Sequence, residues 1–116
     1  MRDPKERLRD ILEAIAAIDR YRDRDRSAFE QDELLQVWFL RHLQIIGEAV
    51  RRLPEEIRNL APDIPYKIIG MRNILVHGYF EIDLDVVWDA VQQDVPPLKL
   101  AVEALLEKLE EQGDGE

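Results

Sequence analysis

One ten-residue stretch, MRNILVHGYF at positions 71–80, concentrates side chains that can do chemistry. It places Arg72, Asn73, His77 and Tyr79 among apolar residues that suit a helix packed on a core. Asn73 and His77 are four residues apart and would share one helix face. Arg72 and His77 would lie about 140° apart around the axis. One helix would not bring them onto one small substrate, whereas two copies related by a twofold axis could.

An arginine and a histidine without a nucleophilic side chain suit phosphoryl transfer of the ribonuclease type. RNA supplies its own nucleophile, the 2′-hydroxyl, while histidine acts as general base or acid and arginine neutralises charge on the phosphate oxygens. The chain has one serine, no threonine and no cysteine, which nearly excludes a Ser, Thr or Cys nucleophile. It also lacks a Glu-x-x-His pair and a glycine-rich phosphate loop, so we expect no metal and no cofactor.

Several other residues are candidates for supporting roles. Asn73 would position His77 or bind the phosphate, and Glu48 would orient Arg72 through an ion pair. Three further cations are candidates for lining an RNA path: Arg51, Arg52 and Lys67. Structural roles stay open for all of them: a helix-end histidine bonded to a carbonyl, a stabilising ion pair between Arg72 and Glu48, and ordinary exposed charges.

The elements that would carry these residues all have helical periodicity. A first helix is expected from Pro4, capped by Asp3, with apolar residues at spacings of three and four up to Tyr21. The polar run 22–27 predicts a loop, and a second helix should span about 32–53.

The second half of the chain continues this pattern. A short helical turn should follow Pro54, and 61–65 should be a connector. The third long helix would run from near Pro65 to Gly78 and would carry the polar cluster. The fourth would begin after Asp83, with a kink or break at the proline pair 96–97.

The predicted fold class is therefore all-α: an up-and-down bundle of four main helices, with a short extra helix and a proline-kinked or split last helix. Residues 1–111 would form one domain, followed by a frayed acidic tail at 112–116. The formal net charge of −9 disfavours general nucleic-acid affinity, but residues 41–80 carry six Lys/Arg against four Asp/Glu. No stretch is apolar enough to span a bilayer or to form the core of a signal peptide, so we expect a cytoplasmic protein without a membrane partner.

These residues resemble those of HEPN-domain proteins of the HepT group, the toxins of type VII HepT/MntA toxin–antitoxin systems. The signature R-x4-H-x-Y is matched by Arg72, His77 and Tyr79, with Asn73 directly after the arginine. The flanking segments DILEAI, LQIIGEA, GMRNILVH and VW with a later proline also match, over roughly residues 8–109. Together they make a specific resemblance, whereas R-x4-H alone would be weak.

The resemblance implies a helical homodimer whose facing motifs form a metal-independent endoribonuclease site, with Arg72 and His77 catalytic and an RNA such as tRNA or mRNA as substrate. It also implies a partner, an MntA-like minimal nucleotidyltransferase that silences the toxin by transferring AMP to Tyr79. The added bulk and negative charge two residues from His77 would block RNA entry. The alternative is a non-catalytic HEPN dimer that docks a nucleotidyltransferase or binds nucleotide.

Overall fold

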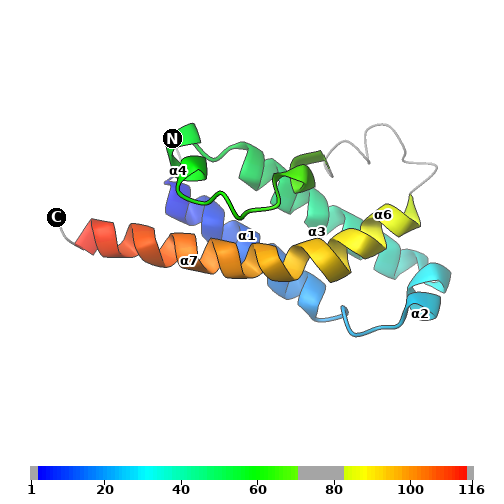
Figure 1. The fold of residues 1–116 in the computed structure, drawn as a ribbon. Coiled ribbons are helices and arrows are strands. Elements are labelled where there is room, and N and C mark those ends of the chain that lie inside the picture. Colours follow the sequence, from blue (N-terminus) through cyan, green and yellow to red (C-terminus); the bar gives the residue numbers. More distant parts are fainter. Residues whose placement is uncertain (1–2, 71–82, 115–116) are drawn as a thin grey trace.

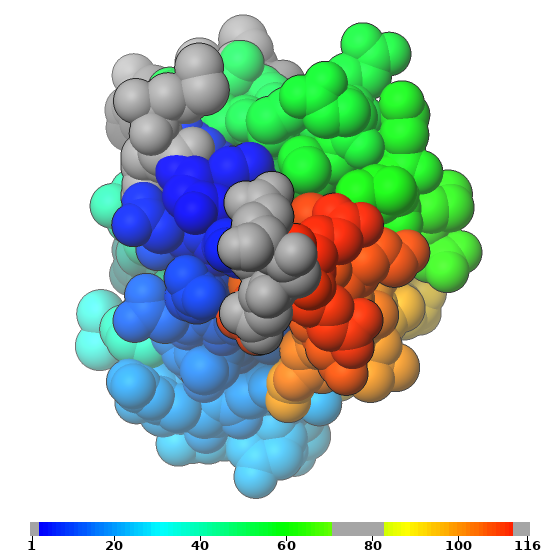
Figure 2. Space-filling view, turned by 90° about the vertical axis from the view of Figure 1, so that its left-hand side faces the viewer, coloured from blue at the N-terminus to red at the C-terminus, as the bar shows by residue number. Residues whose placement is uncertain are grey.

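The computed structural model describes residues 3–70 and 83–114, with side chains up to 112. Two long helices, α1 (Pro4–Asp19) and α3 (Glu33–Arg51), pack against each other, and a long C-terminal helical segment lies across α1 (Figure 1). Figure 2 shows the N-terminal end of α1 in blue beside the C-terminal end of that segment in red. No strand occurs within the described ranges, so the all-α prediction is confirmed.

The helix starts follow from capping. Asp3, Asp25, Asp32 and Asp83 each precede a helix, and their carboxylates accept a backbone N–H two or three residues on. Pro4 occupies the first position of α1, where its missing N–H costs nothing. The second long helix begins at Glu33 and ends at Arg51, within two residues of the predicted limits.

The loop expected at 22–27 ends earlier than predicted, because the short helix α2 (Arg26–Gln31) begins inside it. Asp25 caps this helix, and Phe29 is fully buried within it. The Phe29 ring stacks on Phe39 and contacts Trp88, so tertiary packing holds a six-residue helix that its polar sequence does not suggest.

The segment after α3 contains the short helix α4 (Glu55–Asn59), as predicted, and then the connector 61–65. Where a long helix was expected from Pro65, residues Tyr66–Gly70 form the 3₁₀ helix η1, which packs on α3. The rest of that expected third long helix lies outside the described residues.

The last segment is split as predicted, into α6 (Leu84–Asp89), the π-helical turn η2 (Ala90–Asp94) and α7 (Val95–Asp114). Pro96 and Pro97 cannot donate to the carbonyls four residues before them, which belong to Gln92 and Gln93 inside η2. The wider π turn accommodates this loss. The helix continues to Asp114, past the domain limit placed at residue 111.

One continuous apolar core joins α1, α2, α3, η1 and the C-terminal helical segment. No polar or charged residue is buried within the described part of the chain. The largest fully buried side chains come from five elements: Leu8, Ile11, Ile15, Ile18, Phe29, Phe39, Leu43, Ile46, Ile68, Leu98 and Leu105. The chain ranges that are described contain no helix long and apolar enough to cross a membrane.

Candidate functional site

The predicted catalytic and modification residues, Arg72, Asn73, His77 and Tyr79, lie outside the described residues. Their roles therefore stay predictions. What the structure does describe is the framework around them: the chain that leads into the motif at Gly70, the helix α3 on which it packs, and the charged residues of that helix.

A glycine in α3 allows the chain before the motif to approach closely. A Cβ atom on Gly47 would lie 2.7 Å from the carbonyl oxygen of Ile68 and 3.3 Å from that of Ile69. Because these are backbone atoms, no side-chain rotation could relieve the clash, and any larger residue would have to displace η1 itself. Gly47 thus sets the distance between α3 and η1, directly before the motif.

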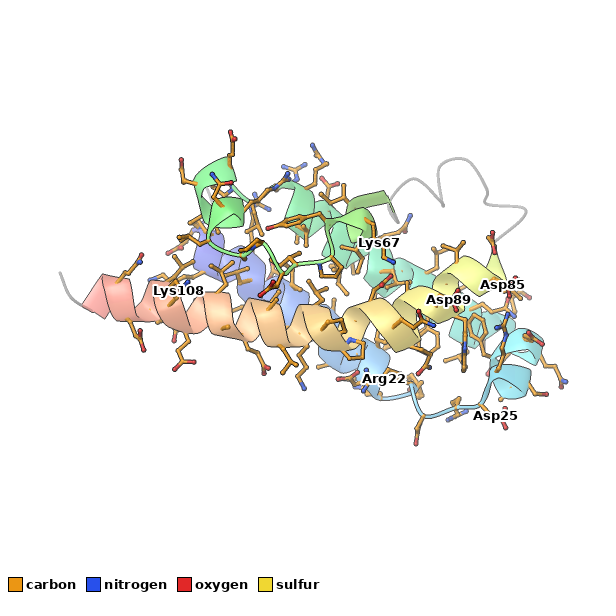
Figure 3. The ribbon with its side chains drawn as sticks, viewed as in Figure 1. Arg22, Asp25, Lys67, Asp85, Asp89 and Lys108 are labelled. Atoms are coloured by element: carbon orange, nitrogen blue, oxygen red, sulfur yellow. The ribbon has the colours of Figure 1, made fainter. Side chains whose placement is uncertain are left out.

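The polar side chains of Lys67 and Tyr66 connect η1 to other parts of the chain besides α3. The Lys67 ammonium lies 3.2 Å from Oδ1 of Asp94, so η1 is tied to the π turn η2. In Figure 3, Lys67 lies on the side of η1 that faces the C-terminal helical segment. The Tyr66 hydroxyl lies 3.0 Å from the Arg58 carbonyl oxygen and 2.8 Å from that of Ala61. Burial raises the pKa of Tyr66, and the nearby Arg58 partly opposes that shift.

Glu48, which follows Gly47, is the centre of a charge cluster on α3. Its Oε1 accepts hydrogen bonds from Arg51 Nη2 at 3.0 Å and from Arg52 Nε at 2.7 Å. The hydrogen bond and charge of Glu48 raise the pKa of Arg51. The structure therefore brings together three of the predicted supporting residues, whereas Lys67 pairs with a different element.

A groove of about 350 Å³ runs along α1 and α3 beside this cluster. Its lining residues come from both helices: Arg7, Asp10, Arg41, Gln44, Ile45, Glu48, Ala49 and Arg52. Sequence reasoning missed Arg7 and Arg41. For Arg41 a signal existed, because Arg41, Ile45, Glu48 and Arg52 recur at spacings of four, three and four and so share a helix face. For Arg7 none existed, since only the packing of α1 on α3 places it there.

The second histidine of the chain, His42, contacts Trp38 one turn before it on α3. The His42 Nδ1 lies 2.7 Å from the Trp38 carbonyl oxygen, and the two rings are 4.4 Å apart. Trp38 in turn donates its indole N–H to the Ala17 carbonyl oxygen at 2.8 Å. Within the described ranges, no three His, Cys, Asp or Glu side chains are grouped to hold a metal ion.

Comparisons with known proteins agree with this framework. The family profile described as ribonuclease HepT-like matches residues 11–105. The chain is 41% identical over 104 residues to a protein of Methanocaldococcus jannaschii named as an inferred RNase, covering 88% of this chain and 95% of that protein. It is 39% identical over 106 residues to an inferred ribonuclease HepT of Thermococcus cleftensis, covering 90% and 96%.

A third relative, an inferred RNase of Caldanaerobacter subterraneus, is 36% identical over 110 residues, covering 93% of this chain and 98% of the relative. No solved structure matches the chain. The fold places the protein in the all-α class. The profile match covers most of the chain, and the chain therefore belongs to the ribonuclease HepT-like family.

Proposed function

We propose that this protein is the toxin of a type VII toxin–antitoxin pair, an endoribonuclease that cleaves RNA without a metal ion. The observation that carries the proposal is membership of the ribonuclease HepT-like family together with a complete R-x4-H-x-Y motif at Arg72, His77 and Tyr79. A helical scaffold alone would not need an arginine and a histidine at this spacing.

In the proposed reaction, the 2′-hydroxyl of RNA attacks the adjacent phosphorus. His77 takes the 2′ proton or delivers a proton to the departing 5′ oxygen, and Arg72 neutralises charge that builds on the phosphate oxygens. The 2′-oxygen–phosphorus bond forms and the phosphorus–5′-oxygen bond breaks. The products are a 2′,3′-cyclic phosphate and a 5′-hydroxyl. Asn73 and Glu48 would orient His77 and Arg72.

The site would be completed by a second copy of the chain, because Arg72 and His77 would be about 140° apart around the axis of an ideal helix. A minimal nucleotidyltransferase would switch the site off. It would transfer the α-phosphoryl group of ATP, as AMP, to the Tyr79 oxygen and release pyrophosphate. The modified phenol would then carry a negative charge and an adenosine beside His77, which would repel and exclude RNA.

The test is a cleavage assay with protein whose Tyr79 is unmodified, as verified by intact mass. Total RNA and tRNA would be incubated in EDTA with the wild type, Arg72→Ala and His77→Ala. We expect cleavage by the wild type that leaves 2′,3′-cyclic phosphate ends, and a loss of at least about 100-fold in each variant. No cleavage by unmodified wild type would favour the docking module, and undiminished cleavage by either variant would remove the proposed mechanism.

A further inference from the structure

The groove along α1 and α3 holds cationic side chains that the motif does not account for. Arg7 of α1, Arg41 of α3 and Arg52, which caps the C-terminal end of α3, line it, against the carboxylates of Asp10 and Glu48. Among the described residues, the Arg7 and Arg41 side chains have neither an ion pair nor a hydrogen bond. Two guanidinium groups, one from each helix and neither paired within the described part of the chain, therefore border one groove.

The local charge stands out against the charge of the whole chain. The formal net charge is −9, so an anion is repelled by most of the surface. In the groove three arginines face two carboxylates, and Arg51 adds a fourth cation beside Glu48. Because Glu48 already bonds to Arg51 and Arg52, its charge offsets little of the field of Arg7 and Arg41.

The spacing of the arginines along the groove indicates what kind of anion it would bind. Arg41 and Arg52 are eleven residues apart, about 16 Å along α3. That span is too long for one phosphate group and suits several along a strand. One guanidinium group can bind two oxygens of the same phosphate through parallel hydrogen bonds. Ile45 and Ala49 supply apolar surface between the charged side chains.

We propose that this groove binds the phosphate backbone of the single-stranded RNA substrate, through Arg7, Arg41 and Arg52. The inference rests on the proposed function and identifies the surface along which the RNA substrate would bind. Glu48 borders the groove, and its neighbour Gly47 contacts η1, the last described element before the motif. A strand bound there passes close to the chain that leads into Arg72 and His77, so the groove would hold nucleotides that flank the cleaved bond.

The experiment measures binding in a His77→Ala background, in which RNA is bound without being cut. A fluorescent single-stranded RNA would be titrated at several salt concentrations against Arg7→Gln, Arg41→Gln and the double variant. We expect about a tenfold loss of affinity for each arginine. The slope of log affinity against log salt should fall by about 0.7 for each phosphate that is no longer neutralised. Arg7→Lys and Arg41→Lys should keep most of the slope.

The matched control is Arg9→Gln, which removes the same charge from α1. Arg9 lies outside the groove and pairs with Glu110 of α7 at 3.0 Å. Its variant should bind RNA as the parent does. Equal losses in Arg9→Gln and Arg7→Gln would mean that only overall charge matters, and would overturn the assignment.

Three other outcomes also decide whether the groove binds RNA. Unchanged RNA affinity in the double variant would overturn the groove while leaving the ribonuclease itself intact, because wild-type cleavage is measured in parallel. A changed oligomeric state by light scattering, with RNA affinity unchanged, would make the groove a protein interface instead. Absence of both binding and cleavage in the unmodified wild type would fail the proposed function, and the groove assignment with it.

Discussion

Glu48 shows how one residue can serve both charge balance and geometry. Its carboxylate bonds to Arg51, the last residue of α3, and to Arg52, which caps that helix, and the three side chains are between one third and about half exposed. Exposed pairs of this kind contribute little stability. We therefore expect Glu48 to act by orienting cations beside the groove, and through the predicted pair with Arg72 it would connect the groove to the motif.

Tyr66 is the residue whose contribution to stability can be tested directly. Tyr66→Phe removes a hydroxyl that donates to the carbonyl oxygens of Arg58 or Ala61, and we expect a loss of about 1 kcal/mol in the free energy of unfolding. The measurement is urea unfolding at pH 7. Tyr21→Phe is the control, because the Tyr21 hydroxyl makes no hydrogen bond among the described residues. Equal midpoints for Tyr66→Phe and wild type would contradict the prediction.

The difference in the free energy of unfolding between wild type and Tyr66→Phe should depend on pH in alkaline solution. The folded pKa of Tyr66 is raised, so the folded state holds its proton more tightly than the unfolded state. This contribution is fully present below the ordinary tyrosine pKa of about 10 and is lost as pH rises through the folded value. The stability advantage of wild type over Tyr66→Phe should therefore shrink above about pH 10.

At the scale of elements, the contact between α3 and η1 is the one most sensitive to a single atom. Gly47→Ala would place a methyl group against the Ile68 carbonyl oxygen and force η1 outward. We expect a destabilisation of about 1–3 kcal/mol from overpacking, reduced by the roughly 1 kcal/mol advantage of alanine over glycine in a helix. Cleavage should fall as well, since η1 leads into the motif. Thermal unfolding and the RNA assay measure the two effects.

Gly70→Ala is the matched control for that substitution. It makes the same chemical change at the end of η1, but a Cβ there would meet no atom of the described residues within 4 Å. Its thermal midpoint should stay close to that of the wild type. If Gly47→Ala melted at the same temperature as Gly70→Ala, the close approach of η1 to α3 at Gly47 would not constrain the position of η1.

How far sequence predicted these elements depended on whether the deciding force was local. Caps and prolines act within a few residues, so the starts of α1 and α6 and the split of the last helix were predicted. The helix α2 depends on burying Phe29 against Phe39 and Trp88, which no local pattern reveals. The pairing of Lys67 with Asp94 and the entry of Arg7 into the groove are likewise products of packing.

At the scale of the whole molecule, the proposed composite site can be tested by a complementation experiment. Arg72→Ala and His77→Ala would each be inactive, yet a heterodimer keeps one intact pair, contributed by both subunits. Unfolding and refolding an equal mixture should restore about a quarter of wild-type activity, since half of the twofold dimers are mixed and each has one site. The measurement is RNA cleavage after mixing, beside each variant refolded alone.

A failure of the mixture to recover activity, with mixed dimers verified by mass spectrometry, would mean that each site is built within one subunit. The need for two copies was inferred from the angle between Arg72 and His77 on an ideal helix. That angle follows from helix geometry alone and says nothing about how two chains pack. The arrangement of the site therefore still requires this experiment, although the fold could be predicted from local patterns.

The π turn η2 also fixes the angular setting of everything that follows it. Val87, Val91 and Val95 are all fully buried at successive spacings of four residues, whereas Leu98, Val102 and Leu105 of α7 follow at three, four and three. A π turn holds one residue more than an α turn, so η2 absorbs an extra residue that in a regular α-helix would turn the twenty residues of α7 by about 100°. Because η2 absorbs it, Leu98, Val102 and Leu105 stay on the same buried face as Val87 and Val91, and the irregular turn keeps the apolar face continuous into α7.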